Sequence, residues 1–171
     1  MLKSLDIDME CYENEAENPE SEPTMLYNYF DTLKKLRIIR MNFDGARYTT
    51  QHLHALGDKI QFLFRLEELF LNFNETVIDG DDGLIMLSEG ISEMAQLQKF
   101  HLTMDFTQIS DPGFNAIAQA LGNKHDLNEL VLSFIETQIQ SNQGLRLLGR
   151  SLKDMENLET FDICITKTKA D

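Results

Sequence analysis

The residues of this sequence most suited to chemistry are a run of aspartates, Asp79, Asp81 and Asp82, interleaved with glycine. A helix–loop–helix calcium site needs oxygen ligands at alternate positions, glycine at the sixth and glutamate at the twelfth. Counted from Asp79, the fifth, sixth and twelfth residues are glycine, leucine and glycine, so the pattern fails at three places. We therefore interpret the run as a turn that leads into a helix, where carboxylates interact favourably with the helix dipole.

Histidines and cysteines form no recognisable catalytic or metal motif. His52 and His54 are two residues apart in a helix-like segment and so face different directions, and we interpret them and His101 as surface histidines. Cys11 and Cys164 lie near opposite ends, which is neither a disulfide framework nor a zinc pattern and is typical of a reducing compartment. Nucleophile-elbow and phosphate-loop motifs are absent from the sequence. We expect no enzymatic activity, no cofactor and no metal site.

Composition narrows the class of partner. The formal net charge is −14, with 29 acidic against 15 basic residues. Such a charge disfavours nucleic acids and anionic membranes and favours a protein partner with a basic surface, although it could also serve only to keep the protein soluble. Apolar runs fall short of the roughly 20 residues that span a bilayer, and the first residues lack the apolar stretch of a signal peptide. We expect an intracellular, cytoplasmic protein without membrane insertion, with association to a cilium or another large assembly as an alternative.

One phrase of apolar residues, at its first, fourth, sixth and eighth positions, recurs along the chain. Leu36, Ile39, Met41 and Phe43 form one copy. From Leu36 onward, successive copies follow at a nearly constant spacing of about 30 residues, a regularity that indicates internal repeats. A further copy opens the chain, and the interval from it to Leu36 is slightly longer than the later ones. The repeats therefore start near residues 2, 36, 66, 97, 127 and 158.

The second half of each repeat carries three apolar residues spaced three and then four apart, as in Leu84, Leu87 and Ile91. This spacing places all three on one face of a helix, whereas the alternating phrase predicts a strand. Each unit is therefore predicted to be a short strand, a turn and a helix. Stacked strands lie about 4.8 Å apart and helices about 10 Å apart, so we expect the array to curve, with strands on the concave side.

These units resemble the leucine-rich repeat in its long, ribonuclease-inhibitor-like form, and similar repeats with an apolar eighth position are abundant in ciliate protists. The turns from Ile109 to Phe114 and from Ile139 to Leu145 look like the bend of that family. The resemblance covers nearly the whole chain. It implies an α/β fold: one domain, residues 1–171, forming a curved horseshoe solenoid of about six repeats with a parallel concave sheet and convex helices.

The chain departs from the family at the asparagine that usually caps backbone groups in the turn. Thr76, Thr107 and Thr137 stand at one position of successive turns instead. We interpret them as a threonine ladder whose hydroxyls bond to neighbouring turns. The alternative is that threonine is merely tolerated at a β-like position.

The resemblance places the binding surface on the concave face, where strand side chains alternate with the buried ones. Phe70 and Val131 are apolar residues at these solvent-facing positions, as in many interfaces, although single exposed apolar residues are common. The candidate protein-binding residues are Arg40, Asn42, Glu68, Phe70, Asn72, Lys99, His101, Thr103, Glu129, Val131 and Ser133.

Two further features concern partners. Residues 10–23 contain six glutamates and no Lys or Arg, which predicts a mobile acidic loop or, alternatively, a contact for a basic partner. The first and last repeats lack polar capping segments, and a terminal repeat without a cap exposes apolar surface. We expect either a longer chain or a partner that covers at least one end of the array.

Taken together, these features predict a non-enzymatic protein–protein interaction scaffold, a structural subunit of a larger assembly. The resemblance leaves an alternative open, a regulatory module of the GTPase-activating, enzyme-inhibitor or ubiquitin-ligase adaptor type. Fold alone does not choose between them. An adaptor would need an F-box-like helical segment, which the sequence lacks.

Overall fold

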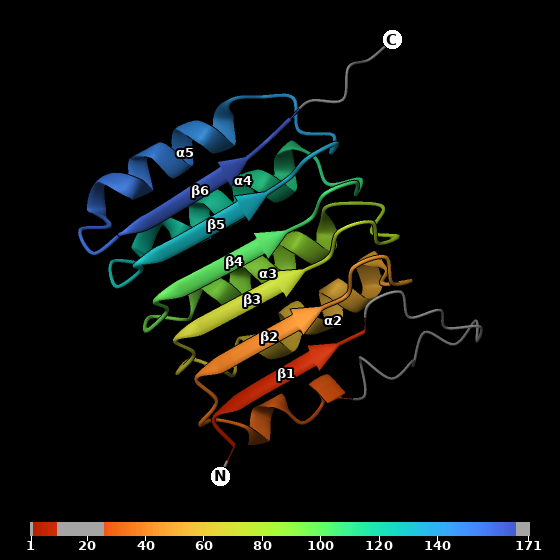
Figure 1. Ribbon diagram of the computed structural model, residues 1–171, viewed down its shortest axis with the longest axis vertical. Helices are drawn as coiled ribbons and strands as arrows, with labels where there is room; N and C mark the ends of the chain where they lie inside the picture. Colours follow the sequence, from red (N-terminus) through yellow and green to blue (C-terminus); the bar gives the residue numbers. More distant parts are fainter. Residues whose placement is uncertain (1, 10–25, 167–171) are drawn as a thin grey trace.

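A computed structural model describes residues 2–9 and 26–166 of the chain, drawn in colour in Figure 1. The acidic segment 10–23 lies outside the described residues. The described chain forms one parallel sheet whose spatial order is the chain order, β1 to β6. Its strands are β1 (Ser4–Asp8), β2 (Ile38–Asn42), β3 (Glu68–Asn72), β4 (Lys99–Thr103), β5 (Glu129–Ser133) and β6 (Thr160–Cys164). The predicted α/β class with a parallel sheet is confirmed.

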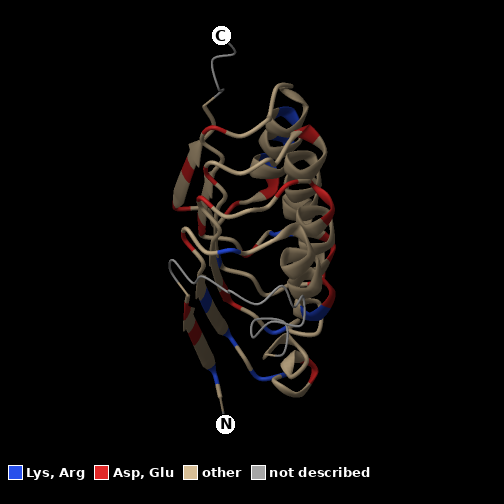
Figure 2. Cartoon of the chain, turned by 90° about the vertical axis from the view of Figure 1, so that its right-hand side faces the viewer, with Lys and Arg blue, Asp and Glu red and all other residues tan. Residues whose placement is uncertain are grey.

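Helices connect the strands and cover one face of the sheet. The α-helices are α2 (Thr50–Ile60), α3 (Asp82–Ser92), α4 (Asp111–Ala120) and α5 (Gln143–Ser151). Short 3₁₀ helices are η1 (Phe30–Thr32), η2 (Leu121–Asn123) and η3 (Leu152–Asp154). Figure 2 shows the strands and the helices as two layers, so the opposite face of the described sheet carries no helix. None of the helices in the described part of the chain is long and apolar enough to cross a membrane.

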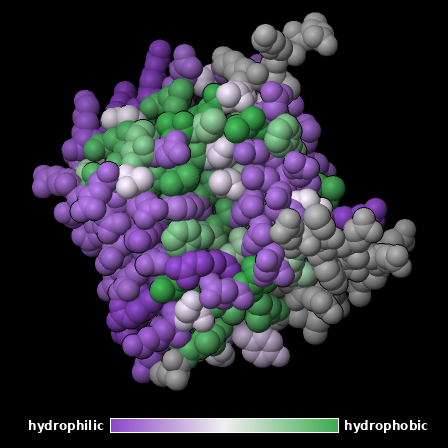
Figure 3. All heavy atoms as spheres, viewed as in Figure 1, coloured by the Kyte–Doolittle hydropathy of each residue, from purple (hydrophilic) through white to green (hydrophobic). Residues whose placement is uncertain are grey.

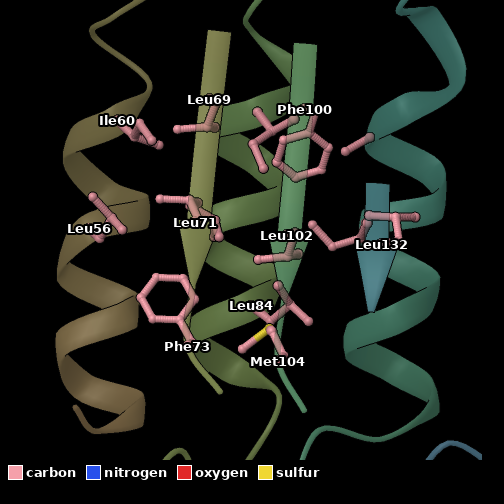
Figure 4. Packing of buried hydrophobic residues seen from close by; sticks show 14 of the residues in the cluster. Leu56, Ile60, Leu69, Leu71, Phe73, Leu84, Phe100, Leu102, Met104 and Leu132 are labelled. Atoms are coloured by element: carbon pink, nitrogen blue, oxygen red, sulfur yellow. The ribbon is translucent and has the colours of Figure 1, made fainter. Parts of the chain in front are cut away.

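Strand register follows the repeat without a slip. Each strand has five residues, and the fourth and sixth residues of every apolar phrase face the helices. The fourth positions form one row across the sheet: Leu5, Ile39, Leu69, Phe100, Leu130 and Phe161. Helix residues such as Leu56 and Leu84 close the core from the other side (Figure 4). The predicted apolar phrase and helical triplet are therefore the two halves of one buried layer.

A left-handed residue recurs in the turn that follows each of four successive strands. Gly45, Glu75, Phe106 and Glu136 have φ values of 65°, 55°, 60° and 54°. Their backbone amides each donate to a carbonyl of the next turn, which continues the strand ladder beyond the sheet. Only the first of these positions is glycine, the residue that adopts this conformation without steric cost. A sequence search for turn glycines would therefore miss three of the four.

Two of the turn threonines, Thr76 and Thr107, bond within their own turns. The hydroxyls of Thr76 and Thr107 are buried and donate over 2.7 Å to the backbone carbonyl three residues earlier in their own turn. The predicted inter-turn bonds of Thr76 and Thr107 are therefore wrong, because each short side chain reaches the carbonyl of its own turn. Other side chains make the connection: Asn74 Oδ1 accepts from the amide of Asp105 at 2.8 Å, and Asp105 Oδ1 accepts from the amide of Ile135 at 2.7 Å.

Candidate protein-binding face

The helix-free face of the sheet carries three cross-strand rows of side chains, because alternate strand residues point away from the core. Every residue predicted for protein binding lies in one of these rows. The rows are Glu68–Lys99–Glu129, then Arg40–Phe70–His101–Val131, then Asn42–Asn72–Thr103–Ser133. Figure 3 views this face and shows hydrophilic side chains with hydrophobic ones among them.

An aromatic ring at the centre of the middle row is held between two nitrogen-bearing side chains. The guanidinium carbon of Arg40 lies 4.9 Å from the centroid of the Phe70 ring. On the other side, the ring centroids of Phe70 and His101 are 4.4 Å apart in an edge-on arrangement. Such contacts each contribute on the order of 0.5–1 kcal/mol at a half-exposed site. Phe70 is therefore fixed in position and keeps part of its surface open to solvent.

Acidic residues hold the cations of this face. Arg40 Nη2 is 2.8 Å from Glu68 Oε2, and Arg40 Nη1 is 3.4 Å from Asp6 Oδ1. Glu129 lies 2.7 Å from His101 Nε2 and 3.5 Å from Lys99 Nζ. Desolvation raises the pKa of Glu129, but its hydrogen bonds and attraction to His101 and Lys99 together outweigh this and lower it. The face has no excess positive charge to offer an anionic ligand.

A side-chain ladder runs along the third row. Asn42 Nδ2 donates to Asp8 Oδ1 over 3.1 Å, and Asn72 Nδ2 donates to Asn42 Oδ1 over 3.0 Å. Thr103 Oγ1 then donates to Asn72 Oδ1 over 2.8 Å. Because each amide in the ladder both donates and accepts, the ladder fixes its orientation. The sequence placed Asn42, Asn72 and Thr103 on this face but gave no sign that they bond to one another.

A groove of about 590 Å³ crosses strands β1 to β4 on this face. Six of the predicted residues line it: Arg40, Asn42, Phe70, Asn72, His101 and Thr103. Glu68, Lys99, Glu129, Val131 and Ser133 share the face but do not line the groove. Asp6, Asp8 and Asn74 line it without having been among the predicted binding residues. The groove thus offers an apolar ring, oriented amides and an acidic end, a mixture found in protein interfaces.

The aspartate run leads into α3, as predicted: Asp79 and Asp81 precede the helix and Asp82 is its first residue. The side chains of Asp79 and Asp81 bond to neighbouring units. Asp81 Oδ1 accepts from the amide of Ser110 at 2.8 Å, and Asp81 Oδ2 accepts from the Ser110 hydroxyl at 2.5 Å. Asp79 Oδ1 accepts from the hydroxyl of Thr50 at 2.6 Å. Within residues 2–9 and 26–166, no group of three or more His, Cys, Asp or Glu could hold a metal ion.

Two of the histidines are half-buried rather than free on the surface. His52 forms a capping box with Thr49, whose hydroxyl accepts from the His52 amide at 3.4 Å while the Thr49 amide donates to His52 Nδ1 over 3.0 Å. Burial lowers the pKa of His52. His101 is the histidine of the groove and contacts Glu129. The interpretation of these two as solitary surface residues is wrong, because helix capping and strand pairing give each a partner.

No protein-family model matches the sequence, and no curated protein is similar to it.

Proposed function

We propose that this protein is a leucine-rich-repeat solenoid of the ribonuclease-inhibitor-like type that serves as a non-enzymatic scaffold for protein–protein interaction. Strand–helix units of about 30 residues, a parallel sheet in chain order and helices on one face support this assignment. The curved shape and the intracellular location belong to the same proposal. The groove over β1 to β4 is the proposed binding surface.

The observation that carries the proposal is that the side chains of the groove hold one another in place. Phe70 is held by Arg40 and His101, and the amides of Asn42 and Asn72 are fixed by the ladder. Side chains that are already immobile lose little conformational entropy on binding, so more of the contact energy appears as affinity.

Charge indicates the kind of protein that would bind. Asp6 and Asp8 are exposed at the β1 end of the groove, and Arg40 is the cation beside them. With a net charge of −14, the chain attracts a partner with a basic surface and repels acidic ones. We place the basic residue of the partner at the β1 end and an apolar residue on Phe70.

The test is a comparison of bound proteins in an extract of the native source. The full chain, the variant Phe70→Ala and the matched variant Val131→Ala are immobilised, and captured proteins are quantified by mass spectrometry. We expect a small set of basic proteins to bind the wild type and Val131→Ala equally and to fall at least tenfold on Phe70→Ala, as for an interface hot spot. Equal capture by all three baits would reject the groove. Capture of a GTPase whose hydrolysis rate the chain increases would favour the regulatory alternative instead.

A further inference from the structure

Two exposed aromatic residues lie in the turn that joins α2 to β3. Phe62 is 41% exposed and Phe64 is 47% exposed, whereas Leu63 between them is 1% exposed. Units of the described chain flank this turn on both sides, so the rings are not exposed for want of a neighbouring unit. Large apolar side chains at a position where other units are polar or small indicate an interface. The later residues at these two positions are Glu93, Ala95, Asn123, His125, Asp154 and Glu156.

Basic residues of the preceding unit lie beside this turn. The turns before β2 and β3 have the same backbone hydrogen bond, from a leucine amide to the carbonyl three residues earlier, at 2.9 Å in each. The amide of Glu67 donates to the carbonyl of Arg37 over 2.8 Å, so the two turns stack in register. Lys34 and Lys35 of the first turn therefore lie beside Phe64 and the residue that follows it.

Three cations accompany the exposed rings and have no acidic partner among the described residues. Lys34, Lys35 and Arg65 are exposed, and none of them forms an ion pair within residues 2–9 and 26–166. The guanidinium carbon of Arg65 lies 5.9 Å from the centroid of the Phe64 ring, so this cation and this ring form one contact. Asp31 is the acid nearest to the two lysines in the sequence, and the three cations outnumber it.

The same edge of the sheet changes sign from one end to the other. The turns before β5 and β6 carry exposed acids, among them Asp126, Glu156 and Glu159. Most lysines and arginines of the described chain precede Leu66, and Figure 2 shows blue segments crowded near the N-terminal end of the sheet. In a chain of net charge −14, this edge therefore has one positive end and one negative end.

We propose that the aromatic–basic turn surface, defined by Lys34, Lys35, Phe62, Phe64 and Arg65, binds a short acidic segment of a partner protein. Carboxylates of the segment pair with the three cations, and an apolar side chain of the segment packs against the two rings. This surface shares no residue with the groove over β1 to β4. The proposal therefore does not depend on the function of that groove.

The distribution of charge favours a narrow occupant. A flat anionic membrane in contact with Lys34 and Lys35 would also approach the acids at the other end of the edge, and a nucleic acid duplex would extend over them. A second copy has acids to offer, but two chains of net charge −14 repel in proportion to the product of their charges. A short segment brings few charges, and at physiological salt it senses only the cations within about 8 Å.

An array of short synthetic peptides tests the chemistry of the segment. Its peptides combine aspartate and glutamate with leucine or phenylalanine in permuted order, and a matched array has asparagine and glutamine in place of the acids. We expect the full chain to bind a subset of the acidic peptides that contain an apolar residue, and to bind none of the amide peptides. Equal binding to the two arrays, or binding to neither, would overturn the proposal.

Two matched pairs of variants locate the binding, measured by fluorescence anisotropy with a peptide selected from the array. Lys35→Glu and Lys153→Glu change the net charge equally, but Lys153 lies at the acidic end of the edge. Phe64→Ala and Phe106→Ala each remove an exposed ring, and Phe106 lies in the turn after β4. We expect Lys35→Glu and Phe64→Ala to lower the affinity at least tenfold. Lys153→Glu, Phe106→Ala and the groove variant Phe70→Ala should leave it unchanged. Equal losses within either pair would reject the turn surface.

Two other occupants predict different results. If the chain sedimented with vesicles that contain phosphatidylserine and Phe64→Ala abolished this, the surface would bind a membrane and the proposal would fail. Oligomers of the free chain that Lys35→Glu dissociates, seen by sedimentation equilibrium, would assign the surface to a second copy and overturn the proposal in the same way. We expect no sedimentation with vesicles and no oligomer that depends on Lys35.

Discussion

The central units and the β6–α5 unit carry the same sequence pattern but differ in burial. Leu69, Phe100 and Leu130 are inaccessible to solvent, whereas Phe161, at the same repeat position, is 42% exposed. The strands and their register are alike and all four side chains are apolar, so the difference in exposure comes only from whether another strand–helix unit packs against the residue. In this chain an apolar phrase specifies half of an interface, and the next unit supplies the other half.

The largest difference in the free energy of unfolding should come from truncating a phenylalanine in a central unit and in the β6–α5 unit. Phe100→Ala removes a fully buried ring and should lower the free energy of unfolding by about 3–5 kcal/mol. Phe161→Ala removes a ring that already contacts water and should cost about 1–2 kcal/mol. Urea denaturation followed by circular dichroism measures both. Equal losses would mean that Phe161 is buried in solution, which a self-associated chain would explain.

A second pair of substitutions tests helix packing with the same change at equivalent positions. Gly57→Ala forces a methyl group against the backbone of Leu87 and should destabilise by about 1–3 kcal/mol. Gly149→Ala meets open space and should stabilise by about 0.5–1 kcal/mol, because alanine is the better helix former. Thermal unfolding of the two variants gives the sign directly. If both were destabilising, α5 would already be covered by another helix.

A smaller effect on stability is expected at Lys124, a buried cation of the central units. Lys124 stands at the repeat position that Met94 and Met155 occupy, and it is 1% exposed. Its ammonium donates to the carbonyl of Ser92 over 2.7 Å. Lys124→Met should restore the apolar pattern and stabilise by about 1 kcal/mol at neutral pH, where the ammonium is buried with its charge.

The pH dependence of stability identifies Lys124 independently. Burial lowers its pKa from 10.5 to about 8, opposed in part by the charge of Glu93. Between these values the unfolded chain holds more protons than the folded one, so the wild-type stability should rise with pH from about 8 to 10.5. Lys124→Met should lack this rise, as determined by urea denaturation at successive pH values. Burial raises the pKa of Tyr27 and Tyr48, which opposes the rise above pH 10 in both proteins alike. Indistinguishable slopes would show that the ammonium is hydrated.

The strand positions and their outward faces could be predicted because periodicity is a local property. A spacing of about 30 residues fixes which side chains share a row, and all the candidate binding residues lie in such rows. The groove could not be predicted in the same way. Val131 fits the pattern as well as Phe70 does, yet only Phe70 lines the groove.

Hydrogen bonds were the least predictable feature. Thr76 and Thr107 recur with the repeat, and that regularity suggested bonds from turn to turn. Their hydroxyls instead bond within a turn, while Asn74 and Asp105 connect the turns. A hydroxyl that can reach two acceptors chooses by backbone geometry, and the left-handed residue in each turn sets that geometry.

The sequence by itself determined the repeat, the parallel order of the strands and the division of each unit into buried and exposed residues, since these follow from residue spacing and the burial of apolar surface. Only the tertiary structure decided which exposed residues form a groove, which side chains bond across strands and which apolar surface stays open. Those features depend on distances between units, and such distances arise only when one unit packs on the next.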